Sequence, residues 1–150
     1  MYFQQITVPG LGCNSYILGC PAARQMVVVD PKRDVQDYLD ISRNEGMKIT
    51  HIIETHVHAD HVSGQQELKS RTGADICILD STPVEYEHIR LTEGQRIEFG
   101  AVRMEVIATP GHTPQSLSLL VSDLMRSEDP WMILTGDLLF VGAIGRPDLA

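Results

Sequence analysis

Basic residues are scarce in this chain of 150 residues. Twelve Lys and Arg residues stand against twenty Asp and Glu residues, which gives a formal net charge of −8, and no run of basic residues occurs. Nucleic acids and anionic membrane surfaces attract proteins mainly through clustered positive charge. We therefore expect neither nucleic acid nor membrane among the partners of this protein.

Long apolar runs and paired cysteines are also missing. No stretch reaches the roughly 18 apolar residues that a membrane span needs, and the segment from Met1 to Val8 is neither a positive leader nor a long apolar run. We therefore expect the protein in the cytosol. The three cysteines, Cys13, Cys20 and Cys77, are odd in number and form no Cys-x-x-Cys pair. We interpret them as reduced, mostly buried side chains.

The overall composition, with 43% hydrophobic and 21% charged residues, is typical of one globular domain. A domain of this size buries roughly 68–70% of the surface that its unfolded chain exposes, which is enough for a packed core without metal or disulfide crosslinks. Any metal bound to this chain is therefore expected to serve its function rather than its stability.

The hydrophobic pattern predicts many strands and few helices. Asp34 is expected to cap a helix that runs to about Glu45 before Gly46, and Ser63 with Gln66 has the spacing of a capping box for a short helix ending at Gly73. The predicted strands are 2–8, 15–18, 26–29, 49–55, 76–79, 96–99, 102–108, 116–121 and 131–135, with a hairpin turn at 100–101. This pattern indicates packed sheets flanked by helices.

A dense group of metal-binding residue types follows the predicted strand 49–55. Three histidines and a carboxylate occur within six positions: His56, His58, Asp60 and His61. Imidazole and carboxylate groups are natural ligands for zinc, iron and manganese. A polar loop without a metal is a poor explanation for so dense a cluster, and the loop could serve two adjacent metal positions.

Further ligand types follow two other predicted strands. His112 stands in Thr-Pro-Gly-His-Thr after the strand 102–108, and Asp137 stands in Thr-Gly-Asp after the strand 131–135. The carboxyl ends of strands are where open sheets commonly place their sites. Taken alone, either segment could be a plain turn. Beside the histidine cluster, we interpret them as the remaining metal ligands.

These motifs resemble those of the metallo-β-lactamase superfamily. His56, His58, Asp60 and His61 match its His-x-His-x-Asp-His signature, and the segments around His112 and Asp137 match its next two ligand motifs in order. The resemblance implies an α+β fold, an αββα sandwich of two packed sheets flanked by helices. Because family members continue well beyond the last of these motifs, we interpret residues 1–150 as one metal-binding domain truncated at its C-terminus, hence only the N-terminal part of the sandwich. Asp30 matches a family aspartate that supports the histidine loop, although an Asp-Pro turn explains it nearly as well.

Within that superfamily, two longer segments resemble persulfide dioxygenases, including forms fused to rhodanese domains. They are Glu-Thr-His-Val-His-Ala-Asp-His-Val-Ser-Gly at 54–64 and the stretch 136–149, which contains Gly-Arg-Pro-Asp-Leu. This resemblance implies one Fe(2+) per chain held by His56, His112 and Asp137. It also implies the oxidation of glutathione persulfide, or another low-molecular-weight persulfide, to sulfite with O2. Two imidazoles and one carboxylate suit a non-haem iron that activates oxygen.

The same resemblance suggests roles for residues beside the iron. Asp60 and His61 are expected to orient the loop and the bound substrate. Arg146 is expected either to attract an anionic glutathione group or to brace the ligand loop through Asp148, although a turn-capping arginine is as good an explanation. His51, in an apolar strand, and His88, in a polar stretch, are interpreted as structural or solvated.

Two other functions remain open from the sequence. The first is a hydrolase of glutathione thioesters with two Zn(2+) ions per chain, in which Asp60 and His61 bind the second ion. The second is a metal-binding half-domain that is inactive without a partner chain. Since the superfamily core needs two sheets, the isolated chain is also expected to fold poorly or to associate, for example as a homodimer, through an exposed sheet face. The acidic composition argues against RNA cleavage.

Overall fold

The first sheet is a mixed sheet whose strands follow one another in chain order. The computed structural model describes residues 1–8, 10, 13–59 and 62–146. Within them the sheet has six strands, antiparallel from β1 to β3 and parallel from β3 to β6. They are β1 (Tyr2–Thr7), β2 (Asn14–Cys20), β3 (Gln25–Val29), β4 (Lys48–Ile53), β5 (Asp75–Leu79) and β6 (Ile89–Leu91).

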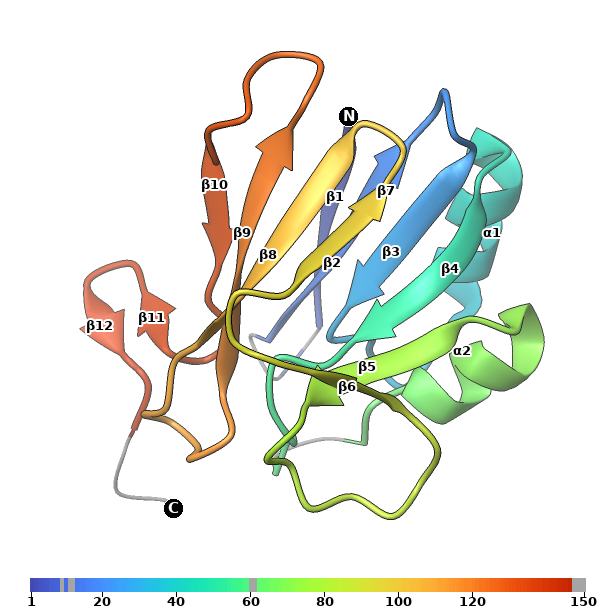
Figure 1. Cartoon of the computed structure of the whole chain (residues 1–150). Coiled ribbons are helices and arrows are strands. Elements are labelled where there is room, and N and C mark those ends of the chain that lie inside the picture. Colours follow the sequence, from blue (N-terminus) through green and yellow to red (C-terminus); the bar gives the residue numbers. More distant parts are fainter. Residues whose placement is uncertain (9, 11–12, 60–61, 147–150) are drawn as a thin grey trace.

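Both helices of the described residues cover the same face of this sheet (Figure 1). α1 (Gln36–Glu45) connects β3 to β4, and α2 (Gln65–Thr72) connects β4 to β5, as parallel neighbours require. Tyr38 of α1 and Leu68 of α2 are fully buried in a cluster with Met26, Ile49 and other side chains of the central strands. The two helices therefore form a layer that packs against one face of the first sheet.

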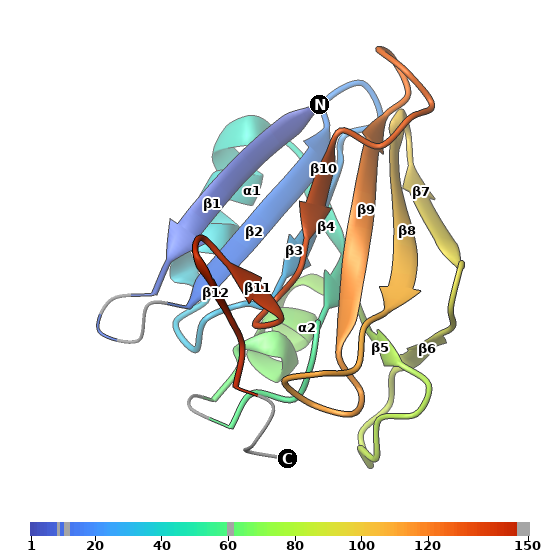
Figure 2. The ribbon, with the colours of Figure 1, turned by 90° about the vertical axis from the view of Figure 1, so that its left-hand side faces the viewer.

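A second, antiparallel sheet packs on the other face (Figures 1 and 2). In the described part of the chain it has four strands in the order β10-β9-β8-β7. They are β7 (Arg96–Phe99), β8 (Val102–Ala108), β9 (Leu117–Asp123) and β10 (Met132–Leu134). The core between the sheets includes Val27, Ile53, Val106 and Leu119, all fully buried. β3 is apolar from Met26 to Val29 because its two faces meet different core layers.

The described residues contain three of the four layers of the predicted αββα sandwich. No helix among them covers the outer face of the second sheet, where Ile133 is 48% exposed. A short hairpin of β11 (Leu139–Phe140) and β12 (Ala143–Ile144) extends from the end of β10. None of the described helices is long and apolar enough to cross a membrane.

Several predicted element boundaries need correction. α1 begins at Gln36 with Val35 in the capping position, although the Asp34 carboxylate still accepts a 3.0 Å hydrogen bond from the Gln36 N–H. α2 is capped by Gly64 without a side-chain cap, so the capping box predicted for Ser63 and Gln66 is wrong. The hydroxyl of Ser63 accepts a 3.2 Å hydrogen bond from the Gln65 N–H and donates to a buried carboxylate, described below.

Candidate metal centre

Three loops that follow strands meet at one end of the two sheets (Figure 2). The loop after β4 carries His56 and His58, the loop after β8 carries His112, and the turn after β10 carries Asp137. A 2.8 Å hydrogen bond from the Leu117 N–H to the Thr55 carbonyl joins the first of these loops to the second sheet. The site is therefore assembled from both sheets.

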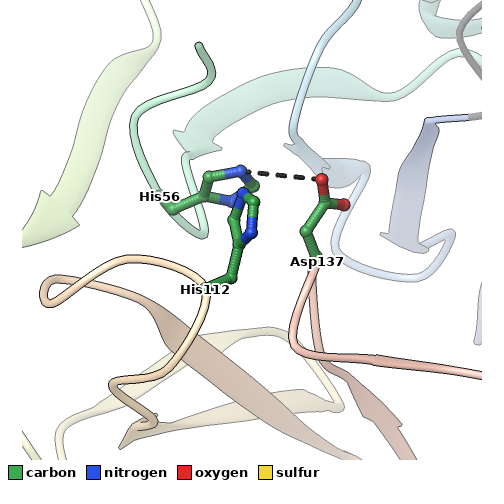
Figure 3. A group of neighbouring side chains, drawn as sticks. All are labelled: His56, His112 and Asp137. Carbon is green, nitrogen blue, oxygen red and sulfur yellow. Dashed lines mark ion pairs between the residues drawn. The ribbon is translucent and has the colours of Figure 1, made fainter. Parts of the chain in front are cut away.

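His56, His112 and Asp137 form one compact group, here called the metal triad (Figure 3). One donor atom from each residue lies within 4.8 Å of the others, and His56 Nε2 is 3.9 Å from an Asp137 carboxylate oxygen. The rings of His56 and His112 are perpendicular, with centroids 5.1 Å apart. Two ligands of one transition metal stand about 3 to 3.5 Å apart. The triad therefore fits a divalent metal ion after small side-chain movements.

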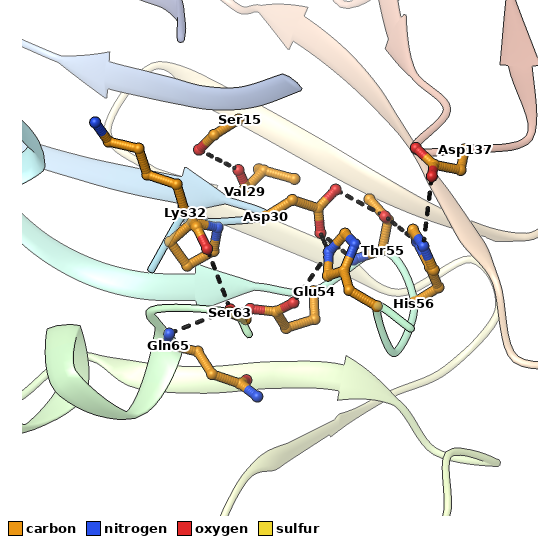
Figure 4. Close-up of polar contacts among 12 residues, drawn as sticks. Ser15, Val29, Asp30, Lys32, Glu54, Thr55, His56, Ser63, Gln65 and Asp137 are labelled. Atoms are coloured by element: carbon orange, nitrogen blue, oxygen red, sulfur yellow. Dashed lines mark hydrogen bonds and ion pairs between the residues drawn. The ribbon is translucent and has the colours of Figure 1, made fainter. Parts of the chain in front are cut away.

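The protonation of the His56 ring follows from its hydrogen bonds (Figure 4). The Thr55 hydroxyl donates to a carboxylate oxygen of Asp30 at 2.7 Å and lies 3.0 Å from His56 Nδ1. Because the single proton of that hydroxyl is donated to Asp30, the hydroxyl oxygen accepts a hydrogen bond from the Nδ1–H of His56. The lone pair of His56 is thereby placed on Nε2, the atom that faces Asp137. Metal-binding histidines are commonly oriented in this way.

His112 is oriented by the backbone of Arg146. Its Nδ1 lies 3.3 Å from the Arg146 carbonyl oxygen, which can only accept, so Nε2 carries the lone pair. Gly145 makes this approach possible, because a side chain there would be 3.1 Å from the Cβ of His112 and would meet the Asp137 carbonyl oxygen. The Arg146 carbonyl therefore lies beside the triad, and the role expected for the Arg146 side chain stays a prediction.

Gly136 brings Asp137 against the first sheet. Its backbone is left-handed, with φ of +51°, and a Cβ atom there would be 2.8 Å from the Cβ of Thr55. Both features exclude a larger residue. The turn after β10 can therefore approach the loop after β4 closely enough to complete the triad.

His58 belongs to a second, more deeply buried group among the described residues. Its Nε2 lies 3.3 Å from a carboxylate oxygen of Asp30 and 3.4 Å from one of Glu54. The three side chains are between 2% and 4% exposed. We call Asp30 and Glu54 together the carboxylate clamp. The predicted ligand His58 is thus held by these two acids, although its ring is only 4.2 Å from that of His56.

Both members of the clamp are fixed by further hydrogen bonds (Figure 4). Asp30 accepts from the N–H and the hydroxyl of Thr55, each at 2.7 Å, and its own backbone is left-handed with φ of 50°. Glu54 accepts from the Ser63 hydroxyl at 2.6 Å. Asp30 therefore supports the histidine loop, and the plain Asp-Pro turn does not describe its environment.

The two histidines of the loop have opposite pKa shifts. Burial and the neighbouring His58 lower the pKa of His56 to about 4, so its ring is neutral and able to bind a metal. Burial also disfavours the charged form of His58, but the adjacent carboxylates of Asp30 and Glu54 outweigh it and raise the pKa to about 10. Burial raises the pKa of Glu54, against the opposing effects of His58 and Ser63.

Several residues singled out in the sequence lie elsewhere. Asp60 and His61, predicted to be ligands or catalytic groups, fall outside the residues that the structure describes, as does Asp148. His51 is half-buried on β4, with Nδ1 3.0 Å from the Thr50 hydroxyl. His88 has Nδ1 2.7 Å from the Tyr86 carbonyl oxygen. Both lie outside the metal triad and the clamp.

Sequence reasoning missed Glu54 and Thr55 as parts of the site. Both were assigned to the apolar strand 49–55, whereas β4 ends at Ile53. A charged residue inside a predicted buried strand was the available signal, because a buried carboxylate needs a partner.

Two cavities flank the triad. One, of about 330 Å³, is lined by His56, Val57 and Tyr86 on the α2 side. The other, of about 290 Å³, is lined by Tyr16, Asp137 and other residues between the start of β2 and the β11–β12 hairpin. Each cavity therefore has one residue of the triad in its lining.

Comparison with known proteins places this fold and site in a family. Residues 8–150 match the model of the metallo-beta-lactamase superfamily. The chain therefore belongs to that superfamily, which confirms the fold class expected from its motifs.

Two groups of named relatives are similar to the chain. The mouse protein named mitochondrial persulfide dioxygenase ETHE1 is 30% identical over 150 residues, which cover 97% of this chain and 55% of the relative. A hydroxyacylglutathione hydrolase of Rhodospirillum rubrum is 32% identical over 133 residues, which cover 87% of this chain and 49% of the relative. The chain thus spans about half the length of these relatives. The resemblance to persulfide dioxygenases is confirmed.

Solved structures show the same likeness. A metallo-beta-lactamase from Staphylococcus aureus subsp. aureus COL superposes with a TM-score of 0.90 at 35% identity, covering 99% of this chain and 46% of that one. ETHE1 from Myxococcus xanthus superposes with a TM-score of 0.87 at 32% identity, covering 99% and 62%. The architecture described here is therefore an N-terminal part of a known fold.

Proposed function

We propose that this chain is the metal-binding part of a persulfide dioxygenase that holds one Fe(2+) with His56, His112 and Asp137. The observation that carries the proposal is the separation of the two buried groups. Since His58 is paired with Asp30 and Glu54, the triad offers two imidazoles and one carboxylate. That donor set leaves positions open on an octahedral ion and suits non-haem iron.

The proposed substrate is glutathione persulfide or a similar small persulfide. One persulfide, one O2 and one water give one thiol, one sulfite and two protons, and the terminal sulfur supplies the four electrons that reduce O2. Bound ferrous iron supplies the redox chemistry that lets oxygen react with sulfur. This chain's residues hold the centre in place, since Thr55 orients His56 and the Arg146 carbonyl orients His112. In this proposal Arg146 attracts an anionic glutathione group, and Asp60 and His61 orient the substrate.

The alternative is a hydrolase of glutathione thioesters with two Zn(2+) ions. It is supported by the 32% identity to a protein named hydroxyacylglutathione hydrolase. In that case Asp60 and His61 would be ligands of the second ion, and the two ions would supply an activated hydroxide for thioester hydrolysis. The half-domain that needs a partner chain remains a third possibility.

One paired measurement tests these functions. Protein purified without oxygen is analysed for metal content, and oxygen uptake is followed on glutathione persulfide. We expect about one iron per chain and oxygen uptake that requires persulfide and does not occur with free thiol. Two tightly bound zinc ions with rapid thioester hydrolysis and no oxygen uptake would establish the hydrolase instead. Metal binding without either activity would support the half-domain.

A further inference from the structure

We propose that the carboxylate clamp keeps His58 out of the metal's ligand set, and that Glu54 thereby determines which metal the triad selects. This inference rests on the proposed metal site at His56, His112 and Asp137. It assigns to Glu54 a positioning role, since Glu54 acts on the metal through His58.

His58 is close enough to become a ligand. Its ring centroid is 4.2 Å from that of His56, whose Nε2 faces Asp137. The two histidines are two residues apart in the same loop after β4. A change of side-chain rotamer, without movement of the sheets, can turn an imidazole over such a distance. The clamp therefore determines which of two positions the His58 ring takes, one beside Asp30 and Glu54 and the other at the metal.

Two buried carboxylates hold His58 in the clamp. Asp30 and Glu54 are 3% and 2% exposed, and each places a carboxylate oxygen within 3.4 Å of His58 Nε2. If His58 left, these two neighbouring carboxylates would remain buried without the ring nitrogen that faces both of them, which is strongly unfavourable. His58 is thus retained by the two carboxylates beside it.

Glu54 is the member of the clamp that can be altered without disturbing the triad directly. Asp30 also binds Thr55, which orients His56, so a change at Asp30 would act on a metal ligand. Glu54 contacts His58 and Ser63. Replacing Glu54 by Gln keeps the size of the side chain and its hydrogen bond with Ser63, and removes the charge.

The expected consequence is a change of ligand set and metal preference. Without the Glu54 charge, His58 can join His56 and His112, which gives three imidazoles. Zinc generally binds nitrogen ligands more tightly than ferrous iron does, and a site with fewer open positions loses its advantage for iron. The clamp therefore keeps the site in its iron-binding form.

The test compares wild type with Glu54→Gln, His58→Gln, the double variant and an exposed control, Glu87→Gln, whose side chain is 89% exposed. Each protein is loaded with one zinc or one ferrous ion without oxygen. X-ray absorption counts the imidazole ligands, and competition between the metals gives their affinity ratio. We expect two imidazoles in wild type and three in Glu54→Gln, with the zinc-to-iron affinity ratio raised at least about tenfold. The double variant should return to two imidazoles and the wild-type ratio, and Glu87→Gln should match wild type.

Several results would overturn the proposal. Three imidazoles in wild type, or loss of one in His58→Gln, would show that His58 is already a ligand. A second metal in wild type that Glu54→Gln loses would mean that the clamp is itself a metal site. If Glu54→Gln does not fold, the ligand counts of wild type and His58→Gln still decide whether His58 is a metal ligand. These counts do not depend on persulfide oxidation, so failure of the proposed function leaves this test intact.

Discussion

The metal triad and the carboxylate clamp lie side by side but are built from different parts of the fold. The triad takes His56 from the first sheet and His112 and Asp137 from the second, whereas the clamp and His58 follow strands of the first sheet alone. The triad is the more open group, with the Asp137 side chain 25% exposed against 3% for Asp30. One group is arranged to receive an ion from outside, and the other already contains its counterion.

This difference assigns separate tasks to two histidines that the sequence presents as equivalent. In the triad, His56 has its remaining nitrogen directed at Asp137 across a 3.9 Å gap. In the clamp, His58 has both carboxylates within 3.4 Å. A group of metal ligands therefore differs from a structural ion pair in how much of the charge on its carboxylates is already balanced by a neighbouring side chain.

Loss of a triad ligand should remove the metal. We expect His112→Ala to fall from about one metal per chain to almost none after dialysis, with activity lost in parallel, because two protein ligands hold a divalent ion weakly. Metal analysis of protein prepared without oxygen measures this. The control is His88→Ala, whose histidine lies outside both groups and should retain the wild-type metal content.

The same preparation distinguishes one metal from two. If the triad holds a single iron, Asp60→Ala and His61→Ala should keep most of their metal and lose about 10–100-fold in rate or affinity. In the two-zinc alternative, each would lower the stoichiometry from two metals towards one. If Asp60→Ala or His61→Ala loses as much metal as His112→Ala, the assignment of a single metal to the triad is wrong.

Removal of the Thr55 hydroxyl should weaken metal binding without abolishing it. That hydroxyl links Asp30 to His56, and Thr55→Val breaks both contacts while keeping the shape of the side chain. We expect metal affinity to fall about 10–100-fold. Thr55→Ser keeps the hydroxyl and should remain close to wild type in a metal competition titration. Equal affinities for Thr55→Val and wild type would mean that the orientation of His56 does not depend on Thr55.

The close approach of the two sheets can be tested at Gly136. Gly136→Ala places a side chain on a left-handed residue and against Thr55, and we expect a loss of about 2–4 kcal/mol in the free energy of unfolding. Gly94 is a matched control, since its φ is +72° and no atom lies within 4 Å of an added Cβ. Gly94→Ala should lose only about 1–2 kcal/mol. Urea denaturation measures both, and equal losses would refute the role of the contact with Thr55.

Some features of this molecule can be predicted from a local stretch of the sequence, whereas others depend on residues that are far apart along the chain. The ligand types after β4, β8 and β10 are predictable, because a predicted strand leads each loop to the same edge. The three-residue β6 was missed, because Ile89–Leu91 carries too short a pattern to separate it from a loop. The exposed hairpin of β11 and β12, two residues per strand, was missed for the same reason.

The separate roles of His56 and His58 cannot be predicted from the sequence, for a different reason. Both are histidines of one signature, and the choice between metal and clamp depends on where Asp30 and Glu54 come to lie. Asp30 is 28 residues from His58 along the chain, and β3 and β4 must pair before the two can meet. The roles of Asp60 and His61, and the domain boundaries, stay predictions.

The smallest expected effect concerns the hydrogen bond that Ser63 donates to Glu54 at 2.6 Å. Ser63→Ala removes the bond and keeps the Glu54 charge, so the ion pair with His58 should persist. Glu54 and Ser63 both line the cavity of about 330 Å³, where water can replace the lost hydroxyl. We therefore expect a loss of about 1 kcal/mol in the free energy of unfolding, with metal content and imidazole count unchanged. Ser42→Ala, which removes a comparable bond to the Met47 carbonyl far from the loop, should cost about as much. A third imidazole in Ser63→Ala would show that the hydrogen bond to Glu54, rather than its charge, retains His58 in the clamp.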